Sequence, residues 1–442
     1  MKLNSTFYFL FKRKIFTKRN LFLLFFIFLL IMLIMYKSYN VIFLEEYNEL
    51  LENKHLMVRG IHQHELVIEN YYKKRKHWET SYLGSILFKN GKIKELHDGH
   101  TKTYIILIWK YWDWLKRRHI SGFDHSRTDP LDDCSVRNCK FTGQDSLTEI
   151  ADAVVIHLQH GEIPSVERRN THQRWVFLSD ESPINTFSFM KHNKPNLTKY
   201  SNIFNWSMTY RSDSDVPVPY GRTVPLSVPK IQKLTYSHLT ELIPDWTNKR
   251  RDVLAAVLMS NCGVSLRMNY LNQLKRYMDI DVHGKCSKNN KNSCPGHFKT
   301  DCGLISKYLF YLVLENSSCR QYLTEKAFFH AYSKGAIPII MGPPIEDCDR
   351  LLPPNSYLHV DNYKSAEDLA ADILTISKSE RKLLMYHEWR TNFEVINEHG
   401  YFGTKSRHYC RICEALNYND NGVKIYDQND LRLFLDPVIS CR

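Results

Sequence analysis

Residues 308–344 read YLFYLVLENSSCRQYLTEKAFFHAYSKGAIPIIMGPP and contain the pattern that decides the fold. Two apolar runs of strand length, Leu309–Leu314 and Ile337–Met341, flank a segment of helical length, Leu323–Lys334. A strand, a helix and a second strand in this order predict neighbouring parallel strands joined by a crossover helix. Ligands bind beyond the carboxyl ends of such strands, so the polar residues after Leu314 are the first place to search for a site.

The same alternation continues outward from this stretch. The other apolar runs of strand length are 104–109, 153–158, 175–178, 253–259, 280–283 and 357–360, and the other helical segments are 266–278 and 366–378. The sequence therefore predicts an α/β fold with parallel sheets. The proline-containing stretch 222–250 interrupts the alternation, and we interpret it as a linker between α/β domains at 101–221 and 251–395, followed by a Cys-containing tail at 396–442.

Polar residues follow the first of the two strands in the opening stretch. Glu315 and Asn316 end the apolar run, and Thr324 opens the helical segment with Glu325 and Lys326 in its first turn. A helix N-terminus with a lysine beside it suits a phosphate group. The ordinary alternative is a capped helix whose charges are solvated. No glycine fingerprint of the dinucleotide or P-loop type is present, which disfavours simple NAD or ATP chemistry.

Three further segments place polar side chains beside apolar runs. In SNCGVSLR, Arg267 lies early on the next predicted helix, and arginine is suited to bidentate contact with phosphate. WVFLSDESPINTF (175–187) and NIFNWSMTYRSDSDVPVPYG (202–221) carry carboxylates after a strand or within a turn. Either carboxylate group could supply a base, but none of the three segments is specific by itself.

Taken together, the four segments resemble the α1,3-fucosyltransferases of glycosyltransferase family 10. The wording that carries the resemblance is WVFLSDESP (175–183), FNWSMTYRSDSDVPVPYG (204–221), SNCGVSLR (260–267) and LENSSCRQYLTEKAFFHAYSKGAIPIIMG (314–342), within residues 100–415. The sequence departs from the family pattern at Leu314, where Phe is usual, in FLSD before Glu181, and in a Cys-rich insert at 286–302. We expect the insert to shape the choice of acceptor.

The resemblance implies a GT-B fold, in which two Rossmann-like domains face a cleft, with the acceptor on the N-terminal side and GDP-fucose on the C-terminal side. It implies displacement at fucose C1 that inverts the β-linked donor to an α-linked product. Glu181 matches the general base, because a carboxylate at a strand end in a cleft can have its pKa raised toward the working range. Asp180 and Asp213 are rival bases, and the structural alternative for Glu181 is to cap the turn before Pro183.

The resemblance also implies how the donor is held. Arg267 and Lys326 match phosphate contacts and would stabilise the charge that develops on the leaving diphosphate. The other donor-binding residues carried over are Asn316 and Glu325 for sugar hydroxyls, Tyr322 in the nucleotide pocket, and Tyr210 with Arg211 near the donor sugar. Two cations can replace a bridging metal, so we predict no required cofactor and no metal ligand, and leave stimulation by Mn²⁺ open.

The N-terminal segment predicts a membrane protein of the secretory pathway. A basic tail at 1–20 precedes an uncharged apolar segment at 21–36, which extends to 44 after a short polar break. We interpret 21–36 as an uncleaved signal-anchor, because no small-residue cleavage site follows as in a signal peptide. The basic residues before it predict a single-pass type II protein, with a stem at 37–100 and a lumenal catalytic part. The short span favours a thin early secretory membrane, and we expect the Golgi.

The oxidising lumen predicts that most of the eleven cysteines form disulfides. We favour two local pairs, Cys134 with Cys139 and Cys410 with Cys413. Half a zinc site or a redox dithiol is the alternative for Cys410 and Cys413. Because the count is odd, one thiol is expected to stay free or to pair between chains.

The charge balance points to small anionic partners. The formal net charge is +13, but much of the excess lies on the tail before residue 20, so we expect no nucleic acid partner. The expected partners are GDP-fucose, a glycoprotein glycan and a membrane through the single N-terminal span, with a homodimer left open. We expect glycans on Asn196 and Asn205, whereas Asn316 should be bare because it lies in the predicted donor site.

The acceptor is not encoded by the donor motifs. The innermost GlcNAc of an N-glycan is our first choice, because ENSSCRQYLTEK and CRIC (410–413) look more like invertebrate members of the family. A lactosamine or Lewis-type acceptor and a protein Ser/Thr side chain are the alternatives. A non-catalytic glycan-binding or nucleotide-binding homologue and a binder of acidic polysaccharide are the competing classes. Replacement of Glu181, Arg267 or Lys326 would have favoured a non-catalytic homologue, and none of these is replaced.

Overall fold

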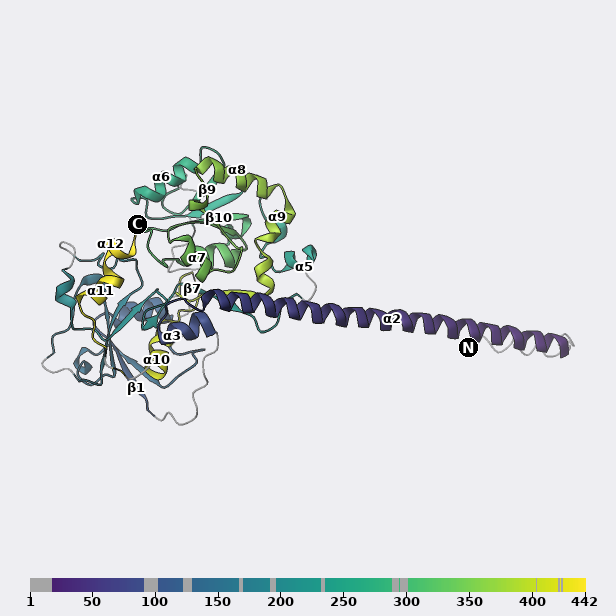
Figure 1. Ribbon diagram of the computed structural model, residues 1–442, viewed down its shortest axis with the longest axis horizontal. Coiled ribbons are helices and arrows are strands. Elements are labelled where there is room, and N and C mark those ends of the chain that lie inside the picture. Colours follow the sequence, from purple (N-terminus) through teal and green to yellow (C-terminus); the bar gives the residue numbers. More distant parts are fainter. Residues whose placement is uncertain are drawn as a thin grey trace, which may run out of the picture. The chain divides into compact units, whose positions relative to one another are not determined.

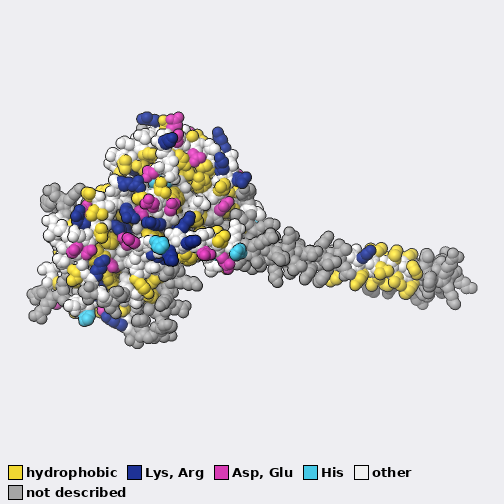
Figure 2. Space-filling view, viewed as in Figure 1, with side chains coloured by type: hydrophobic (Ala, Val, Ile, Leu, Met, Phe, Trp, Pro, Cys, Tyr) yellow, Lys and Arg dark blue, Asp and Glu magenta, His cyan; other side chains and the backbone are white. Residues whose placement is uncertain are grey.

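The computed structural model describes residues 18–442 except 91–101, 122–128, 167–169, 191–195, 232–234, 288–293, 295–300, 403, 420–421 and 423. The chain divides into two units, residues 1–63 and 64–442. In the first unit, residues 18–63 belong to helix α2 (Lys18–Arg75). Every side chain from Phe25 to Tyr36 is exposed, and these form the yellow band on the long helix in Figure 2. None of the described helices meets the length and apolarity needed to cross a membrane.

The second unit contains two parallel sheets (Figure 1). The first has the strand order β2-β1-β3-β4-β5-β6, and all its neighbouring strands are parallel. Its strands are β1 (Tyr104–Ile108), β2 (Cys139–Thr142), β3 (Ala153–His157), β4 (Arg174–Ser179), β5 (Trp206–Thr209) and β6 (Val216–Pro217). The central strands β3 and β4 are buried along their whole length, as expected of a parallel sheet covered on both faces.

The second sheet has the order β12-β11-β10-β8-β9 and is also fully parallel. Its strands are β8 (Ala255–Leu258), β9 (Ile280–His283), β10 (Phe310–Leu314), β11 (Ile337–Met341) and β12 (Leu358–His359). The apolar runs predicted as strands all contain strands of one sheet or the other, so the α/β fold with parallel sheets is confirmed. A third, two-stranded antiparallel sheet pairs β7 (Gly221–Pro225) with β13 (Phe393–Asn397).

The helices are mostly short and surround the two sheets. They are α3 (Tyr82–Ser85), α4 (Trp112–Lys116), α5 (Tyr236–Glu241), α6 (Ser265–Leu274), α7 (Ile345–Leu351), α8 (Ala366–Ser377), α9 (Glu380–Met385), α10 (His408–Tyr418), α11 (Gln428–Leu435) and α12 (Pro437–Ser440). The helix predicted at 323–334 is instead a π-helical turn, η8 (Lys326–Ala331), followed by a 3₁₀ turn, η9 (Tyr332–Lys334). π-Helical turns occur frequently at functional sites.

Part of the predicted stem belongs to the folded body. Tyr71, Trp78 and Leu87 are buried in its hydrophobic core, although the segment around them is rich in charge. Arg75 packs over the ring of Tyr71 at 3.3 Å and donates to the carbonyl of Arg350 at 2.7 Å. Residues 64–90 therefore do not act as a stem: the lysines between these anchors are exposed, whereas Tyr71, Trp78 and Arg75 are buried.

The C-terminal tail returns to the first sheet rather than extending the second domain. Leu431 and Phe434 of α11 pack in one cluster with Phe177 of β4 and Phe204. Figure 1 shows the yellow helices α10 and α11 in the same half of the body as β1. The last residues then reach the second domain, since the backbone N–H of Arg442 donates to the carbonyl of Ser318 at 2.9 Å.

The disulfides differ from the predicted local pairs. Cys134 pairs with Cys410 and Cys139 pairs with Cys413, so the predictions of Cys134–Cys139 and Cys410–Cys413 are wrong. Cys410 and Cys413 are spaced three apart on α10 and share one helical face, and this face lies against the segment that carries the other two. Both sulfurs are used, which also removes the zinc alternative. The remaining bonds are Cys262–Cys286, Cys294–Cys302 and Cys319–Cys441, and Cys348 is free and buried.

Candidate active site

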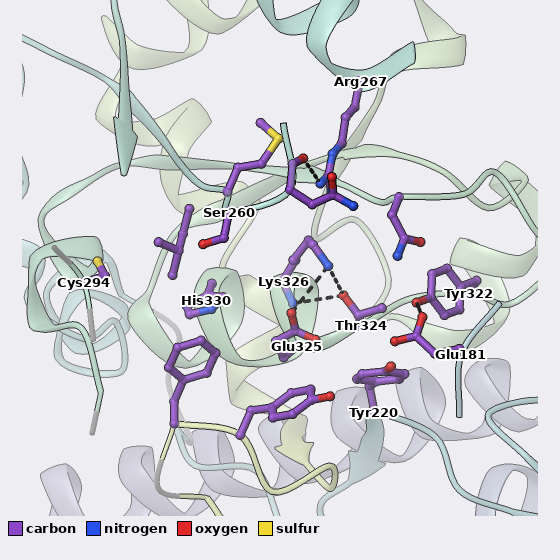
Figure 3. A pocket seen from close by; sticks show the side chains of 16 residues that line it. Glu181, Tyr220, Ser260, Arg267, Cys294, Tyr322, Thr324, Glu325, Lys326 and His330 are labelled. Atoms are coloured by element: carbon purple, nitrogen blue, oxygen red, sulfur yellow. Dashed lines mark hydrogen bonds and ion pairs between the residues drawn. The ribbon is translucent and has the colours of Figure 1, made fainter. Parts of the chain in front are cut away.

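A pocket of about 270 Å³ lies where the carboxyl ends of the two sheets meet (Figure 3). Glu181 enters it just after β4 of the first sheet, and Asn261 and Asn316 enter it just after β8 and β10 of the second. The lining residues are Glu181, Tyr220, Leu258, Met259, Ser260, Asn261, Arg267, Cys294, Asn316, Tyr322, Thr324, Glu325, Lys326, His330, Tyr401 and Phe402. Both domains therefore contribute to one site.

Glu181 is held from the opposite domain. The hydroxyl of Tyr322 donates to its Oε2 at 3.0 Å. Burial raises the pKa of Glu181, and the neighbouring charge of Asp180 raises it further, while Tyr322, Arg118 and Lys326 oppose the shift. A carboxylate with a raised pKa that borders a pocket has the properties of a general base.

The two rival carboxylates do not share this environment. Asp180 is only 1% exposed and faces away from the pocket, toward Arg118 at 2.9 Å. The Arg118 guanidinium and the surrounding histidines outweigh the effect of burial and hold the pKa of Asp180 well below its ordinary value. Asp213 is bound by Arg211 at 2.5 Å and does not line the pocket. Of the three candidates, the pocket contains Glu181 alone.

Lys326 sits in a cage of oxygen atoms on the second domain (Figure 3). Its Nζ donates to Glu315 Oε2 at 3.0 Å and to Thr324 Oγ1 at 2.8 Å, and it lies 3.4 Å from Glu325 Oε1. Burial lowers the pKa of Lys326, but Glu315 and Glu325 raise it more, so the ammonium stays charged. Glu315 also accepts from the backbone N–H of Thr324 at 2.9 Å, which fixes the turn that carries the lysine.

Arg267 lies in the first turn of α6 and is 4% exposed. Its Nη2 donates to the carbonyl of Asn261 at 2.5 Å and its Nη1 to the carbonyl of Leu314 at 3.3 Å. Its Nε has no hydrogen-bond partner among the residues that the structure describes. A buried, charged donor that borders a pocket and lacks a partner is suited to an anionic ligand.

The structure brings most of the predicted donor-binding residues together but separates two of them. Asn316, Tyr322 and Glu325 line the same pocket as Arg267 and Lys326. Tyr210 does not line it and lies behind Tyr322, with the ring centroids 5.0 Å apart. Tyr210 therefore supports the pocket wall without lining it.

Arg211 is engaged elsewhere, so its predicted contact with the donor sugar does not fit this conformation. Its guanidinium binds Asp213, donates to the carbonyl of Leu433 at 2.5 Å and packs over the ring of Phe434 at 4.7 Å. These contacts fasten α11 to the first domain. The arginine is thus a structural residue of the C-terminal return.

Sequence reasoning did not assign a role to several pocket residues. Glu315 and Tyr220 lie within the recognised motifs. The position of Glu315 directly after a strand and that of Tyr220 directly before a glycine could have indicated a role for each. Burial lowers the pKa of His330 to about 4, so its imidazole is neutral at physiological pH. Tyr401 and Phe402 come from the C-terminal tail. The sequence of the tail gave no indication that it contributes to the pocket, because its packing against the first domain is a tertiary contact between distant residues.

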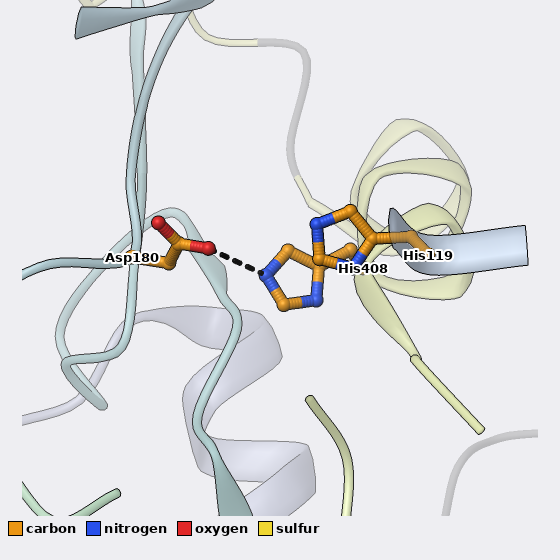
Figure 4. Close-up of side chains that lie close together, drawn as sticks. All are labelled: His119, Asp180 and His408. Carbon is orange, nitrogen blue, oxygen red and sulfur yellow. Dashed lines mark ion pairs between the residues drawn. The ribbon is translucent and has the colours of Figure 1, made fainter. Parts of the chain in front are cut away.

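A second cluster of titratable groups lies beneath the pocket (Figure 4). His119, Asp180 and His408 have ligand atoms within 4.8 Å of one another. The two imidazole rings are stacked, with centroids 4.0 Å apart, and their Nδ1 atoms lie 2.7 and 3.0 Å from Ser406 Oγ. Stacked rings direct their remaining nitrogens side by side, and Arg118 already supplies a positive charge to Asp180. The cluster therefore fits a buried ion pair better than a metal centre.

Two of the three sequons differ sharply in accessibility. Asn196 is exposed and caps a short turn. Asn205 is 8% exposed, and its amide accepts from the backbone N–H of Trp175 and donates to the carbonyl of Lys424. A glycan on Asn205 does not fit this structure, because both ends of the amide are engaged in the interior.

Comparisons with known proteins agree with the motifs. The family described as "Fucosyltransferase, N-terminal" matches residues 101–221, and "Glycosyltransferase family 10 (fucosyltransferase) C-term" matches residues 247–431. Alpha-(1,3)-fucosyltransferase 7 of Rattus norvegicus is 31% identical over 72% of this chain and 76% of its own length. The Homo sapiens 4-galactosyl-N-acetylglucosaminide 3-alpha-L-fucosyltransferase FUT6 is 31% identical over 73% of this chain and 83% of its own length.

A nematode protein and a solved structure are also similar. Alpha-(1,3)-fucosyltransferase fut-5 of Caenorhabditis elegans is 30% identical over 65% of this chain and 72% of its own length. A crystal structure of an alpha1,3-fucosyltransferase with GDP-fucose superposes with a TM-score of 0.48 and 14% identity, covering 78% of this chain and 98% of that one. On the family matches and the extended similarity to curated relatives, this chain belongs to glycosyltransferase family 10, the fucosyltransferases.

Proposed function

We propose that this chain transfers L-fucose from GDP-β-L-fucose to a GlcNAc hydroxyl of a glycoprotein glycan, forming an α1,3 linkage with inversion. One observation carries the proposal. Glu181 from the first domain lines the same pocket as Arg267 and Lys326 from the second. A base and two cations that converge from opposite sides match what a displacement at a sugar diphosphate requires. We further infer that the two parallel sheets form the GT-B arrangement.

In this mechanism each group has one task. Glu181 removes the proton from the acceptor hydroxyl as the oxygen attacks fucose C1. Arg267 and Lys326 bind the diphosphate and stabilise the charge that it gains as the bond to fucose breaks. Asn316 and Glu325 lie beside them and hold hydroxyl groups of the donor. The two cations fit a mechanism without a required metal, and whether Mn²⁺ stimulates the reaction is a separate measurement.

The proposal is tested by incubating the purified full-length chain with GDP-fucose and defined glycans, followed by linkage analysis of the product. An α1,3-linked fucose on GlcNAc is the expected result. A chain that binds GDP but transfers no fucose to any acceptor in the panel would indicate a non-catalytic homologue instead.

The acceptor that we place first is the innermost GlcNAc of an N-glycan, on the wording of the sequence motifs. A lactosamine-type GlcNAc is the second candidate, because a human relative that covers most of this chain is named for action on 4-galactosyl-N-acetylglucosaminide. Parallel assays with a trimmed N-glycan and with free lactosamine separate the two. Transfer to the galactosylated disaccharide alone would remove the N-glycan core from consideration.

We also propose a Golgi location with type II topology. The support is the basic tail before the uncharged segment at 21–36, together with the unbroken exposure of apolar side chains from Phe25 to Tyr36. Deleting residues 1–40 and supplying a cleavable leader should yield a secreted enzyme that is active. Retention of that shortened chain in membranes would contradict the proposed anchor.

A further inference from the structure

Asp180 is surrounded by one arginine and three histidines. It is 1% exposed, and its Oδ2 lies 2.9 Å from Arg118 Nη2, 3.4 Å from His399 Nε2 and 3.6 Å from His408 Nε2. Its Oδ1 lies 3.8 Å from His157 Nε2. Arg118 and His157 of the first domain and two histidines of the C-terminal tail therefore surround the carboxylate of the residue that directly precedes Glu181.

The surroundings of Asp180 reach the pocket through three routes. Tyr220, which lines the pocket, donates from its hydroxyl to the backbone carbonyl of Asp180 at 3.0 Å and stacks on His399 at 3.8 Å. Arg118 donates to the hydroxyl of Tyr401, another lining residue, at 2.5 Å. The third route is the peptide bond to Glu181. The ion pair of Asp180 with Arg118 is thus connected to the backbone next to Glu181 and to two aromatic residues that line the pocket, Tyr220 and Tyr401.

Asp180 and Glu181 directly follow β4, which ends at Ser179, and their side chains have different surroundings. Arg118 and the histidines hold Asp180 in the interior. The next residue, Glu181, lines the pocket and accepts from the hydroxyl of Tyr322 at 3.0 Å. The charged and titratable groups that face Glu181 are Asp180, Arg118, Tyr322 and Lys326, with Tyr210, Tyr220 and Tyr401 nearby.

We propose that Asp180 is a positioning residue of the transfer reaction, which acts through its ion pair with Arg118 to aim Glu181 into the pocket and to keep a second negative charge beside it. The inference rests on the proposed role of Glu181 as the base. Asp180 does not line the pocket, so its removal should change the rate of transfer and the ionisation of Glu181 and leave donor binding unchanged.

The experiment uses the full-length chain and two isosteric substitutions. Asp180→Asn removes the charge beside Glu181. Glu398→Gln is the matched control, because Glu398 is 2% exposed and bound by Arg222 and Arg411, but it does not face Glu181. Both changes break a buried ion pair, so both should lower thermal stability, and turnover is normalised to the fraction of molecules that bind GDP.

For Asp180→Asn we expect kcat to fall at least tenfold while KM for GDP-fucose stays within about twofold. Loss of the neighbouring negative charge also lowers the pKa of Glu181, so the acidic limb of the kcat/KM profile should move to lower pH. Glu398→Gln should show neither change. If Asp180→Asn keeps a wild-type kcat and an unmoved acidic limb per folded molecule, Asp180 is only a fold-stabilising residue.

Should Asp180→Asn fail to fold, the double variant Arg118→Gln/Asp180→Asn replaces it, because it leaves no uncompensated buried charge. The same fall in kcat at an unchanged KM is expected, and a wild-type kcat overturns the proposal. Glu181→Gln is assayed beside these variants. If Glu181→Gln remains active, Glu181 is not the base and the proposed function is wrong. If Glu181→Gln is inactive but Asp180→Asn is fully active, only the proposed role of Asp180 is wrong.

Discussion

The hydroxyl of Tyr322 donates a 3.0 Å hydrogen bond to Glu181 across the boundary between the two parallel sheets. Burial and the nearby carboxylates raise the pKa of Tyr322 well above its ordinary value, so the phenol keeps its proton and remains a donor. Glu181, the proposed base in the first domain, is therefore oriented by a residue of the second domain that lines the same pocket as Arg267 and Lys326. Movement of one domain against the other would move Glu181 away from Arg267 and Lys326.

Glu181→Gln should abolish transfer while GDP binding stays near normal. The amide keeps the size of the side chain and can accept from Tyr322, but it cannot take a proton. Single-turnover transfer and calorimetric titration with GDP measure the two properties separately. Asp213→Asn is the control, since it changes a carboxylate that Arg211 already binds, and it should transfer fucose at a rate close to wild type.

The acidic limb of the pH profile should lie above the ordinary range of a glutamate. Burial, and next the charge of Asp180, raise the pKa of Glu181. A general base works only when ionised, so kcat/KM falls as the pH drops through this raised value. Measuring kcat/KM from pH 4 to pH 8 tests the prediction, and an acidic limb at or below the pKa of about 4.3 of a free glutamate would contradict it.

Arg267→Ala and Lys326→Ala should each weaken GDP binding by roughly tenfold or more, because a hydrogen bond to a charged group contributes about 1.5–3 kcal/mol. They should differ in stability. Lys326→Ala leaves Glu315 buried without its cation, which costs about 3 kcal/mol. Titration with GDP and thermal unfolding distinguish the two effects. Lys378→Ala, an exposed lysine of the same domain, should change neither.

The ionisation of Glu398 should make the stability of the protein, rather than its catalytic rate, depend on pH. Burial opposes its ionisation, but Arg222 and Arg411 lower its pKa to about 2. A carboxyl group whose pKa is lowered by folding stabilises the protein above its unfolded pKa of about 4.3, and this stabilisation is lost as the pH falls toward 2. At pH 7, Glu398→Gln should therefore reduce the free energy of unfolding by about 3 kcal/mol.

Unfolding of the wild type and of Glu398→Gln at several pH values between 7 and 2 measures this difference. We expect it to be constant above about pH 4.5 and to shrink below it, as the wild-type carboxyl takes up its proton. A difference that persists unchanged at pH 2 would mean that the substitution acts through packing alone.

The crossed disulfides can be read directly from peptides cleaved without reduction. We expect fragments that join Cys139 to Cys413 and Cys134 to Cys410. The double variant Cys139→Ser/Cys413→Ser should lower the free energy of unfolding by about 2–5 kcal/mol, since the bond closes a long loop. Peptides that join Cys410 to Cys413 would instead support the local pairing.

Sequence reasoning found most strands of the two parallel sheets. Ile280–His283 and Ile337–Met341 were predicted with the bounds that β9 and β11 have. It missed β2, with the sequence CKFT, and β5, with the sequence WSMT, because these strands are short and partly polar. Burial on both faces produces a continuous apolar run such as that of β11.

The site was predictable where its residues follow strands in the recognised motifs. Glu181, Arg267, Asn316, Tyr322, Glu325 and Lys326 all line the pocket, which agrees with the predicted grouping. The sequence could not reveal that Arg211 turns toward α11 or that Tyr401 enters from the tail. Both depend on the return of the C-terminal segment to the first domain, through contacts between residues that lie 222 and 283 positions apart along the chain.

The packing of the C-terminal segment against the first domain sets the order in which the disulfides of the protein can form. Cys134 and Cys139 emerge from the ribosome 276 and 274 residues ahead of the partners that they will meet. At about 5–20 residues per second, their thiols wait roughly 15–55 seconds of synthesis before those partners exist. The half of the enzyme that is translated first is thus the last to be completed, and a premature stop codon near residue 400 would damage the half that carries Glu181.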